Sequence, residues 1–249
     1  MKKKDSLHGL LWVIGGIATV FLTMAALLPL LDHVLEVEVK KTENAVPTVT
    51  LTPVPAEEVL VTTVYVTEET GREITAIYIE VFHPGTEKIS CVELPVDTKV
   101  TLSSELYKSL QAYSPELPQY LKLRKMAEGF SKEYAFTGCN RIVSEALGGV
   151  IPHYICADSA ALAQWKELLQ SEHTPSQFFE GYTEWLAATE SDMPETARWI
   201  YYESFRKVKE YSEEMAAGTM EKDGFTISQK QVKKQLELFI REIEEGKGR

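Results

Sequence analysis

The sequence predicts an α/β fold in which a central, mostly buried sheet is flanked by helices and preceded by one transmembrane helix. Residues 10–31 form a long apolar run. Between residues 59 and 94, short stretches rich in β-branched and apolar residues are typical of strands. From residue 102 onward apolar residues recur with helical spacing, interrupted by a strand-like stretch at residues 150–157. Helix–strand–helix order beside a strand hairpin is typical of layered α/β domains.

The apolar run at residues 10–31 contains no charged side chain. About 20 apolar residues suffice to cross a hydrocarbon core about 30 Å thick. Lys2, Lys3 and Lys4 precede the run and favour a cytoplasmic N-terminus. We therefore expect a single-pass protein of the cytoplasmic membrane, with its N-terminus inside and its C-terminal domain extracytoplasmic. A cleaved signal peptide is the weaker alternative, because Met24-Ala25-Ala26 offers small residues for cleavage although the run is long for a signal.

The organisation that follows has four segments. We expect a cytoplasmic tail at residues 1–6, a transmembrane anchor at 7–31, an extended stalk at 32–57, and an extracytoplasmic α/β domain at 58–249 with a helical C-terminal third. The stalk is predicted from its prolines, since proline lacks a backbone donor and favours extended chain.

Charge excludes one class of partner. The chain has 26 Lys and Arg against 37 Asp and Glu, a net charge of −11 over 249 residues. The segment before Asp32 holds only Lys2, Lys3, Lys4 and Asp5, which leaves 23 basic and 36 acidic residues and a net charge of −13 for the rest. Nucleic-acid binding rewards clustered basic charge, so no nucleic-acid partner is expected. Solubility of an exported domain is the favoured interpretation of this acidity, with a binding role of the acidic residues as the alternative.

Cysteine and histidine spacing predicts no metal site. Cys91, Cys139 and Cys156 show no CxxC spacing, and the five histidines are scattered. Buried free thiols are the favoured interpretation, although an oxidising exterior also allows one disulfide. The sequence contains no GxSxG, Walker, GxGxxG or HExxH motif.

Three strands are expected in the first half of the domain, at residues 59–66, 74–82 and 89–94. The second and third read as a hairpin, because His83-Pro84-Gly85-Thr86 between them has turn chemistry. Residues 74–82 are nearly continuously apolar, which predicts burial on both faces.

Helices are expected to follow, and several carry recognisable end signals. Gly148 ends one helix, Asp158 caps the next, and Thr174 opens a capping box with proline at the first helical position. Asp192 is expected to begin a further helix in the same way. The predicted helices lie at residues 102–113, 117–130, 137–147, 159–169 and from 228 onward, with a short edge strand at 225–227.

The end of the third strand carries the first candidate site residue. Residues 94–98 read Leu-Pro-Val-Asp-Thr, and loops at strand ends commonly carry sites. Asp97 is therefore a candidate for metal, phosphate or acid–base chemistry. The alternative is a turn residue whose carboxylate accepts hydrogen bonds from nearby backbone N–H groups.

These features resemble the LytR-CpsA-Psr family. Members of that family have an N-terminal anchor, a stalk, and a strand–turn–strand that ends in a Ser-Ile-Pro-Arg-Asp-Thr type of motif, where this chain has Leu-Pro-Val-Asp-Thr. A second block is similar too: Lys-Glu-Tyr-Ala-Phe-Thr-Gly at residues 132–138, a helix up to Gly149, and Ile-Pro-His-Tyr-Ile at 151–155. The resemblance covers residues 74–169.

The resemblance implies an extracytoplasmic transferase that moves a glycopolymer from a polyprenyl-pyrophosphate carrier onto the cell wall, with a divalent metal such as Mg. Diphosphate recognition calls for bidentate arginines and for a hard cation held by carboxylates. The implied partners are the membrane bilayer and a polyprenyl-linked glycopolymer or envelope proteins.

The chain departs from the family pattern at two positions that matter. The motif arginine falls on Val96, which removes five hydrogen-bond donors and a fixed charge. The metal-binding aspartate of the first strand falls on Thr75, and the family's later Arg-x-Arg block has no counterpart. The catalytic residues are therefore unknown.

Four residues are candidates for ligand binding. Asp97 and Lys132 match the family pattern, whereas Arg72 and Arg141 are basic residues close in sequence to the two motif blocks. Arg141 is expected in the first turn of a helix, whose positive end favours anions. A solvated helix residue is the alternative for Arg141.

Three functions remain open from the sequence. We expect a degenerate family member that binds or regulates rather than catalyses. The alternative is an active phosphotransferase with relocated phosphate ligands, and a third is an unrelated membrane-tethered interaction module. Aromatic stripes are expected to pack in the core, with the lining of a lipid groove as the alternative; they comprise Phe178, Tyr182 and Trp185, and Trp199 and Tyr202.

Overall fold

The structure is a computed structural model that describes residues 59–68 and 73–246. The tail, anchor and stalk expected at residues 1–57 lie outside the described residues, as does Arg72. Within the described ranges, no helix has the length and apolar character that a membrane crossing needs.

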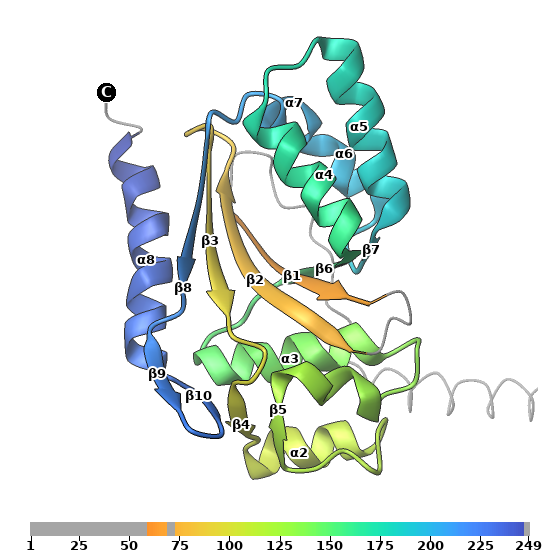
Figure 1. Ribbon diagram of the computed structural model, residues 1–249, viewed down its shortest axis with the longest axis vertical. Helices are drawn as coiled ribbons and strands as arrows, with labels where there is room; N and C mark the ends of the chain where they lie inside the picture. Colours follow the sequence, from red (N-terminus) through yellow and green to blue (C-terminus); the bar gives the residue numbers. More distant parts are fainter. Residues whose placement is uncertain (1–58, 69–72, 247–249) are drawn as a thin grey trace, which may run out of the picture. The chain divides into compact units, whose positions relative to one another are not determined.

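Six strands form the main sheet, in the spatial order β7-β6-β1-β2-β3-β8 (Figure 1). β1, β2 and β3 are antiparallel neighbours, β6 runs parallel to β1, and β8 runs parallel to β3. The strands expected at 59–66, 74–82, 89–94 and 150–157 are thereby confirmed. The bounds are β1 Leu60–Thr67, β2 Ile74–His83, β3 Lys88–Leu94, β6 His153–Asp158, β7 Glu190–Ser191 and β8 Glu210–Met215.

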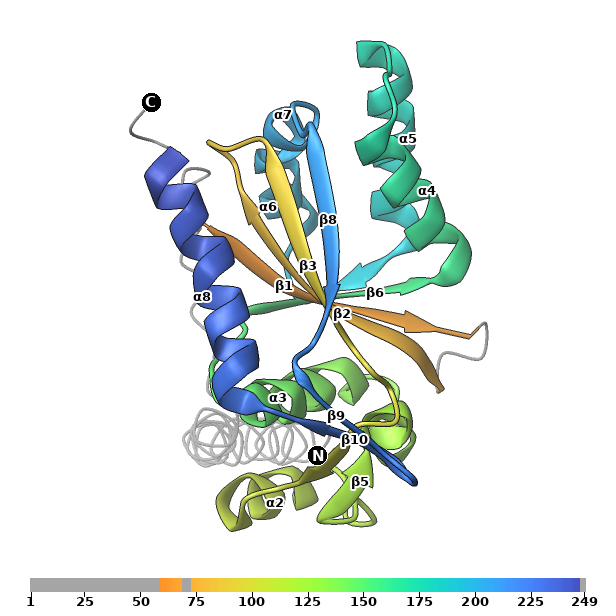
Figure 2. The same cartoon turned by 60° about the vertical axis from the view of Figure 1, so that its left-hand side comes forward.

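Helices cover both faces of this sheet (Figures 1 and 2). One face carries α2 (Ser104–Gln111), the 3-10 helix η1 (Leu123–Gly129), α3 (Ala135–Leu147) and α8 (Gln229–Gly246). The other carries α4 (Ser159–Gln170), α5 (Pro175–Ala188), α6 (Glu195–Ile200) and α7 (Tyr202–Phe205). Two small two-stranded sheets, β4 (Lys99–Thr101) with β5 (Tyr120–Lys122) and β9 (Gly218–Glu221) with β10 (Gly224–Ile227), complete the fold.

β2 shows why the sheet is buried on both faces. Ile77, Ile79 and Val81 pack into the cluster beneath α3, η1 and α8, whereas Phe82 packs into the cluster beneath α4–α7. Successive side chains of a strand point to opposite faces. A nearly continuous apolar strand therefore supplies two cores, as its sequence predicts.

Most of the predicted helix ends are confirmed. Gly148 takes a left-handed conformation (φ 68°) at the end of α3. Asp158 Oδ1 accepts a 2.7 Å hydrogen bond from Ala161 N at the start of α4. Thr174 and Gln177 form the reciprocal capping box of α5.

The helix predicted at residues 117–130 is wrong. The chain instead forms β5, paired with β4, and then the 3-10 helix η1. Proline is tolerated in the first turn of a helix, so Pro118 alone does not prevent one, and the difference comes from tertiary pairing with β4. Pairing with β4 provides hydrogen-bond partners for the backbone of residues 120–122.

The C-terminal third contains the predicted helices but also four strands, β7, β8, β9 and β10. β8 was not predicted, because its sequence Glu-Tyr-Ser-Glu-Glu-Met lacks an apolar pattern and is held at the sheet edge by backbone pairing with β3. β10 confirms the short strand expected at residues 225–227. Asp192 does not cap α6; its Oδ1 accepts a 2.9 Å hydrogen bond from Tyr154 N, while Pro194 precedes the helix without a side-chain cap.

The three cysteines are free thiols, as the sequence favours. Cys91 and Cys139 are buried and Cys156 is half-buried. Burial raises the pKa of Cys156 to about 11, so this thiol stays protonated at neutral pH.

Candidate functional site at the turn of residues 95–98

The loop that follows β3 is a tight turn of residues 95–98. Thr98 N donates a 2.9 Å hydrogen bond to Pro95 O, and the Thr98 hydroxyl donates to the same oxygen. Thr98 is fully buried, which fixes the turn against the domain. Asp97 therefore projects from a rigid backbone at the end of the β2–β3 hairpin.

Two segments distant in sequence clamp this turn through backbone hydrogen bonds. Arg124 N donates to Val96 O at 2.8 Å, and Leu123 N donates to Thr98 O at 3.0 Å, both from η1. Phe225 N of β10 donates to Asp97 O at 3.1 Å. The preceding residue, Gly224, has φ 156°, and a Cβ there would lie 2.6 Å from Asp97 O, so only glycine allows this approach.

Four charged side chains meet at the turn and are called the Asp97 cluster. Asp97 Oδ2 lies 3.2 Å from Arg124 Nη2, and Asp97 Oδ1 lies 3.6 Å from Lys122 Nζ. Arg124 Nη1 lies 3.7 Å from Glu73 Oε1. All four side chains are 40–46% exposed, so each ion pair contributes at most about 1 kcal/mol to stability.

The Asp97 cluster leaves one buried donor unused. Arg124 Nε is buried and has no hydrogen-bond partner among the residues that the structure describes. Buried polar atoms are nearly always paired, and an unpaired one marks a place for water or a ligand. The Asp97 cluster is therefore a candidate anion site whose two cations are matched by two carboxylates.

The positions of the family's arginine and aspartate play other roles here. Val96 is half-buried and packs against the apolar core, so it presents no donor. Thr75 is exposed, and its hydroxyl donates a 3.2 Å hydrogen bond to Val66 O. The guanidinium nearest the turn comes from η1 instead.

The structure does not join the remaining candidate residues to Asp97. Lys132 is exposed in the turn before α3. Arg141 lies in α3 and donates from Nη2 to Ser109 Oγ of α2 at 2.8 Å. Across residues 59–68 and 73–246, no hydrogen bond or ion pair connects any two of Asp97, Lys132 and Arg141.

Sequence reasoning missed Lys122 and Arg124. Their signal is a pair of basic residues two positions apart, one at the end of β5 and one at the start of η1. The signal was hidden because residues 117–130 read as a helix, in which positions i and i+2 face different directions.

The described residues offer no ready metal site. Among them, no group of three or more His, Cys, Asp or Glu side chains could hold a metal ion. Asp97 and Glu73 are the carboxylates of the Asp97 cluster, and each faces a cation of the chain. These residues do not fit a hard divalent ion, which prefers several free oxygen ligands.

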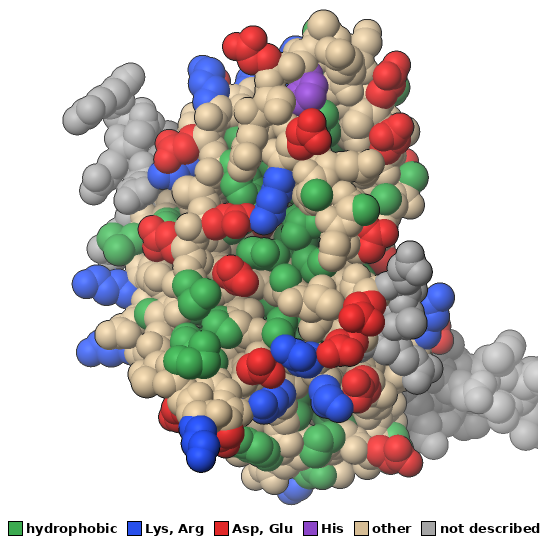
Figure 3. Space-filling view, in the orientation of Figure 1, with side chains coloured by type: hydrophobic (Ala, Val, Ile, Leu, Met, Phe, Trp, Pro, Cys, Tyr) green, Lys and Arg blue, Asp and Glu red, His purple; other side chains and the backbone are tan. Residues whose placement is uncertain are grey.

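The space-filling view also shows both basic and acidic side chains near the Asp97 cluster (Figure 3). Over the part of this face that carries β4, β5 and the β9–β10 hairpin, basic and acidic side chains are intermingled (Figure 3). Lys99 illustrates this balance, because its ammonium pairs with Glu221 and Asp223 of the hairpin.

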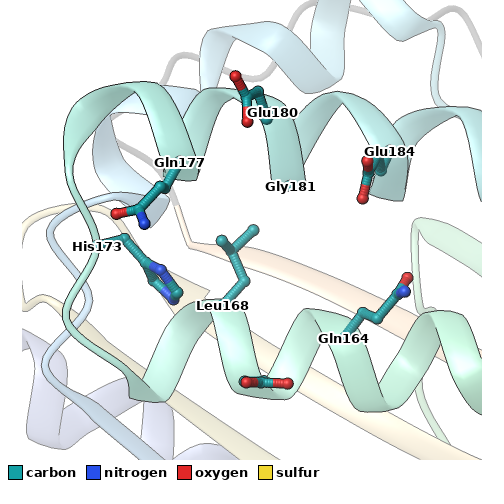
Figure 4. Close-up of a pocket in the computed structure, with 8 residues that line it drawn as sticks. Gln164, Leu168, His173, Gln177, Glu180, Gly181 and Glu184 are labelled. Carbon is teal, nitrogen blue, oxygen red and sulfur yellow. The ribbon is translucent and has the colours of Figure 1, made fainter.

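A hollow lies between α4 and α5 (Figure 4). It is an open groove of about 290 Å³. Glu167, Glu180 and Glu184 give it acidic walls, and His173 lies at one end. None of the candidate ligand-binding residues lines it.

The α4–α7 face hides an ionisable group that the sequence did not single out. Glu80 of β2 is 5% exposed, and burial raises the pKa of its carboxyl to about 7. The Trp165 indole donates to it, and the positive charge of Lys166 partly offsets the shift. Lys166 itself pairs with Glu213 of β8.

Comparison with known proteins finds similarity in structure. No protein-family model and no curated protein matches the chain. The solved structure of B. subtilis TagT is 10% identical over 73% of this chain and 89% of that chain, with a TM-score of 0.45. Lin1025 from Listeria innocua is 10% identical over 74% of this chain and 98% of that chain, with a TM-score of 0.49.

A third neighbour carries the family name. It is a "LytR-CPS2A-psr family protein YwtF (TagT) with bound octaprenyl pyrophosphate lipid", 11% identical over 73% of this chain and 88% of that chain, with a TM-score of 0.46. The name of this third neighbour is that of the family that the sequence resembles. At this identity and TM-score the three neighbours assign no role to any residue of this chain, so the roles of its residues rest on their own contacts.

Proposed function

We propose that this chain is a membrane-anchored extracytoplasmic protein of cell-envelope glycopolymer assembly, similar to LytR-CpsA-Psr proteins. It binds or regulates rather than transfers the polymer. The single-pass anchor at residues 7–31 and the inside location of the N-terminus belong to this proposal, and their support is the uncharged apolar run behind Lys2, Lys3 and Lys4.

The charge balance of the Asp97 cluster carries the proposal against transfer. Asp97 and Glu73 match Lys122 and Arg124, so the four charges sum to zero. Phosphoryl transfer needs an excess of positive charge on the equatorial oxygens in the transition state. The turn therefore has side chains that can bind a phosphate, but it lacks the excess of positive charge that transfer needs.

Binding remains chemically reasonable at the same place. Lys122 and Arg124 are half-exposed, and Arg124 Nε is a buried donor without a partner. A carrier diphosphate would compete with Asp97 and Glu73 for these cations. Because of this competition, we expect anion binding to be weak and readily reversed.

One observation favours the alternative of an active phosphotransferase. Arg124 places a guanidinium 3.2 Å from Asp97, although Val96 occupies the family's arginine position. Arg141, Lys132 and Arg72 are the further basic candidates for this alternative. It also requires a divalent metal such as Mg, for which the described residues show no ligand group.

A binding experiment tests the proposal. The full chain is reconstituted in vesicles, and its affinity for farnesyl pyrophosphate is measured. Arg124→Gln is expected to weaken binding by about tenfold, since a hydrogen bond to a charged group is worth about 1.5–3 kcal/mol. Lys125→Gln is the matched control, because Lys125 is an exposed cation on the same helix. Equal affinity of the wild type, Arg124→Gln and Lys125→Gln would contradict binding at this site.

A further inference from the structure

The face of the sheet beneath α4–α7 carries a cluster of ionisable side chains from β2, β3, β8 and α4. Glu80 of β2 is 5% exposed and accepts a hydrogen bond from the Trp165 indole of α4. Cys91 is paired with Glu80 in the register of β2 and β3, and its Sγ donates a 3.3 Å hydrogen bond to Tyr211 Oη of β8. The cluster, here called the Glu80 cluster, comprises Tyr78, Glu80, Cys91, Lys166, Tyr211 and Glu213.

Lys166 of α4 supplies the positive charge of the Glu80 cluster. Its ammonium pairs with Glu213 of β8, and these two side chains are 24% and 35% exposed. Lys166 Nζ also lies 4.5 Å from the ring centroid of Tyr78 and 5.8 Å from that of Tyr211. Burial lowers the pKa of Lys166, but the hydrogen bond to Glu213 and nearby negative groups outweigh burial and raise it, so Lys166 stays charged. Burial raises the pKa of Glu80 and the charge of Lys166 opposes this shift, so Lys166 interacts with two carboxyls and pairs with the more exposed one.

Aromatic packing holds α4 in place above these groups. Trp165 stacks on Trp185 and meets Phe205 edge-on, with ring centroids 5.1 Å apart in both pairs. The long side chain of Lys166, the next residue, can therefore change partner by rotating its own bonds while the helix stays fixed. The aromatic side chains expected in the core are buried in α5 and half-buried in α6 and α7; they are Phe178, Tyr182 and Trp185, and Trp199 and Tyr202.

Glu80 is the member of the cluster whose charge changes near neutral pH. Burial raises the pKa of its carboxyl to about 7. Burial also raises the pKa of Tyr78, Cys91 and Tyr211, whose ordinary values already lie above about 8, so these groups stay neutral. Glu93 of β3, opposite Tyr78 in the register, adds a negative charge that further opposes ionisation of Tyr78. The proton of Glu80 is thus the variable charge of the cluster.

We propose that loss of the Glu80 proton moves the Lys166 ammonium from Glu213 to Glu80 and thereby loosens β8. A buried carboxylate without a cation strongly opposes folding, whereas the half-exposed carboxylate of Glu213 is solvated by water once it is released. The proton passes to water, and no bond between heavy atoms forms or breaks. β8 then keeps its backbone pairing with β3 but loses its ion pair to α4.

β8 leads directly to the segment that clamps the 95–98 turn (Figure 1). Just after β8, Ala216 N donates a 2.8 Å hydrogen bond to Glu93 O, and β9 and β10 follow. Phe225 N of β10 then donates to Asp97 O. We therefore expect the turn to be held more firmly, and to bind a diphosphate more tightly, while the Glu80 cluster retains its proton. This consequence rests on the proposed function, because it concerns the affinity of that site.

Hydrogen exchange tests the change of partner on the full chain in detergent. The exchange rate of residues 210–217 is measured by mass spectrometry at about pH 6 and about pH 8, and each rate is divided by the intrinsic rate of an unstructured chain at that pH. In the wild type this ratio is expected to rise about fivefold between the two pH values, since a partly exposed ion pair changes an equilibrium by about that factor. Glu80→Gln cannot ionise, so its ratio is expected to stay the same.

Two variants of β8 separate this local effect from a general loss of stability at high pH. Glu213→Gln lacks the ion pair to α4, so its ratio is expected to be high at both pH values, without the wild-type rise. Glu214→Gln is the matched control, because Glu214 is an exposed glutamate on the other face of β8, and it is expected to keep the wild-type rise. A rise of wild-type size in Glu213→Gln or in Glu80→Gln, or no rise in the wild type, would overturn the proposal.

Farnesyl pyrophosphate binding tests the consequence for the turn. The affinities of the wild type and of Glu80→Gln are compared in vesicles at each pH, so ionisation of the ligand affects both proteins equally. Glu80→Gln is expected to bind about threefold more tightly than the wild type at about pH 8, and equally at about pH 6. Equal affinity at about pH 8, with binding present, would overturn the link between β8 and the turn. Absence of binding by both proteins at both pH values would contradict the proposed function, and the exchange ratios would then decide the change of partner alone.

Discussion

Charged side chains are placed in opposite ways at the 95–98 turn and on the face of the sheet beneath α4–α7. At the 95–98 turn, four ionised side chains stay half-exposed and pair with one another. Beneath α4–α7, Glu80 and Arg198 are buried without an ion pair among the described residues, and burial shifts the pKa of each toward its neutral form. Exposed pairs contribute little to stability and remain free to exchange partners, whereas buried charges oppose folding and are held by packing.

The largest expected effect on stability comes from the aromatic packing beneath α4–α7. Phe205→Ala should lower the free energy of unfolding by about 3–5 kcal/mol, because Phe205 is buried and stacks on Phe82 while α7 has only four residues. Phe179→Ala is the control, since Phe179 is half-exposed. Urea unfolding of the full chain in detergent measures both. Equal losses would mean that α6 and α7 do not depend on this stack.

Glu80 should give the next largest effect, and it depends on pH. Its carboxyl has a pKa of about 7 in the folded domain, against 4.5 as the reference value. The folded state therefore retains a proton that the unfolded state has lost. Stability should fall as pH rises from 4.5 to 7, by roughly 3 kcal/mol in total.

Glu80→Gln tests this charge directly. The amide still accepts from Trp165 but cannot ionise, so the variant should lose the pH dependence and be more stable than wild type at about pH 8. Urea unfolding at about pH 5 and about pH 8 measures the difference. Parallel pH profiles for the two proteins would show that Glu80 is not the titrating group.

Gly224→Ala should have an intermediate effect at the turn. An added Cβ would lie 2.6 Å from Asp97 O, and its φ of 156° is unfavourable for alanine. We expect a loss of about 1–3 kcal/mol. Gly149→Ala is the control, because a Cβ there meets nothing within 4 Å. A similar loss in both variants would mean that β10 does not clamp the turn.

Arg124→Gln should have the smallest effect on stability, below about 1 kcal/mol, since its ion pairs are half-exposed. The same substitution should weaken farnesyl pyrophosphate binding, as described above. Thermal unfolding of the variant and of Lys125→Gln measures the stability term. A loss of several kcal/mol would show that Arg124 holds the fold rather than a ligand.

Local patterns predicted most of the fold. The β2–β3 hairpin, α3 with Gly148, and α5 with its capping box all follow from residues within one element. β8 could not be predicted, because its place depends on pairing with β3, 122 positions away in the sequence for Ser90 and Ser212. Edge strands with charged side chains carry little pattern of their own.

The candidate site was predicted only in part. Asp97 and its turn were recognised from the order of residues 94–98 and from the family resemblance. Lys122 and Arg124 reach Asp97 only because β5 and η1 replace the expected helix, which is a result of tertiary pairing with β4. Buried Glu80 was not singled out, although burial on both faces was predicted for its strand, residues 74–82.

The central claim is that the 95–98 turn binds a diphosphate but does not catalyse phosphoryl transfer. The most direct measurement supplies the full chain in vesicles with a polyprenyl-pyrophosphate-linked glycan, a polysaccharide acceptor and Mg²⁺, and follows release of polyprenyl phosphate. The account predicts no release by the wild type above that of Asp97→Ala. Sustained release that disappears in Asp97→Ala would contradict it and establish the active alternative.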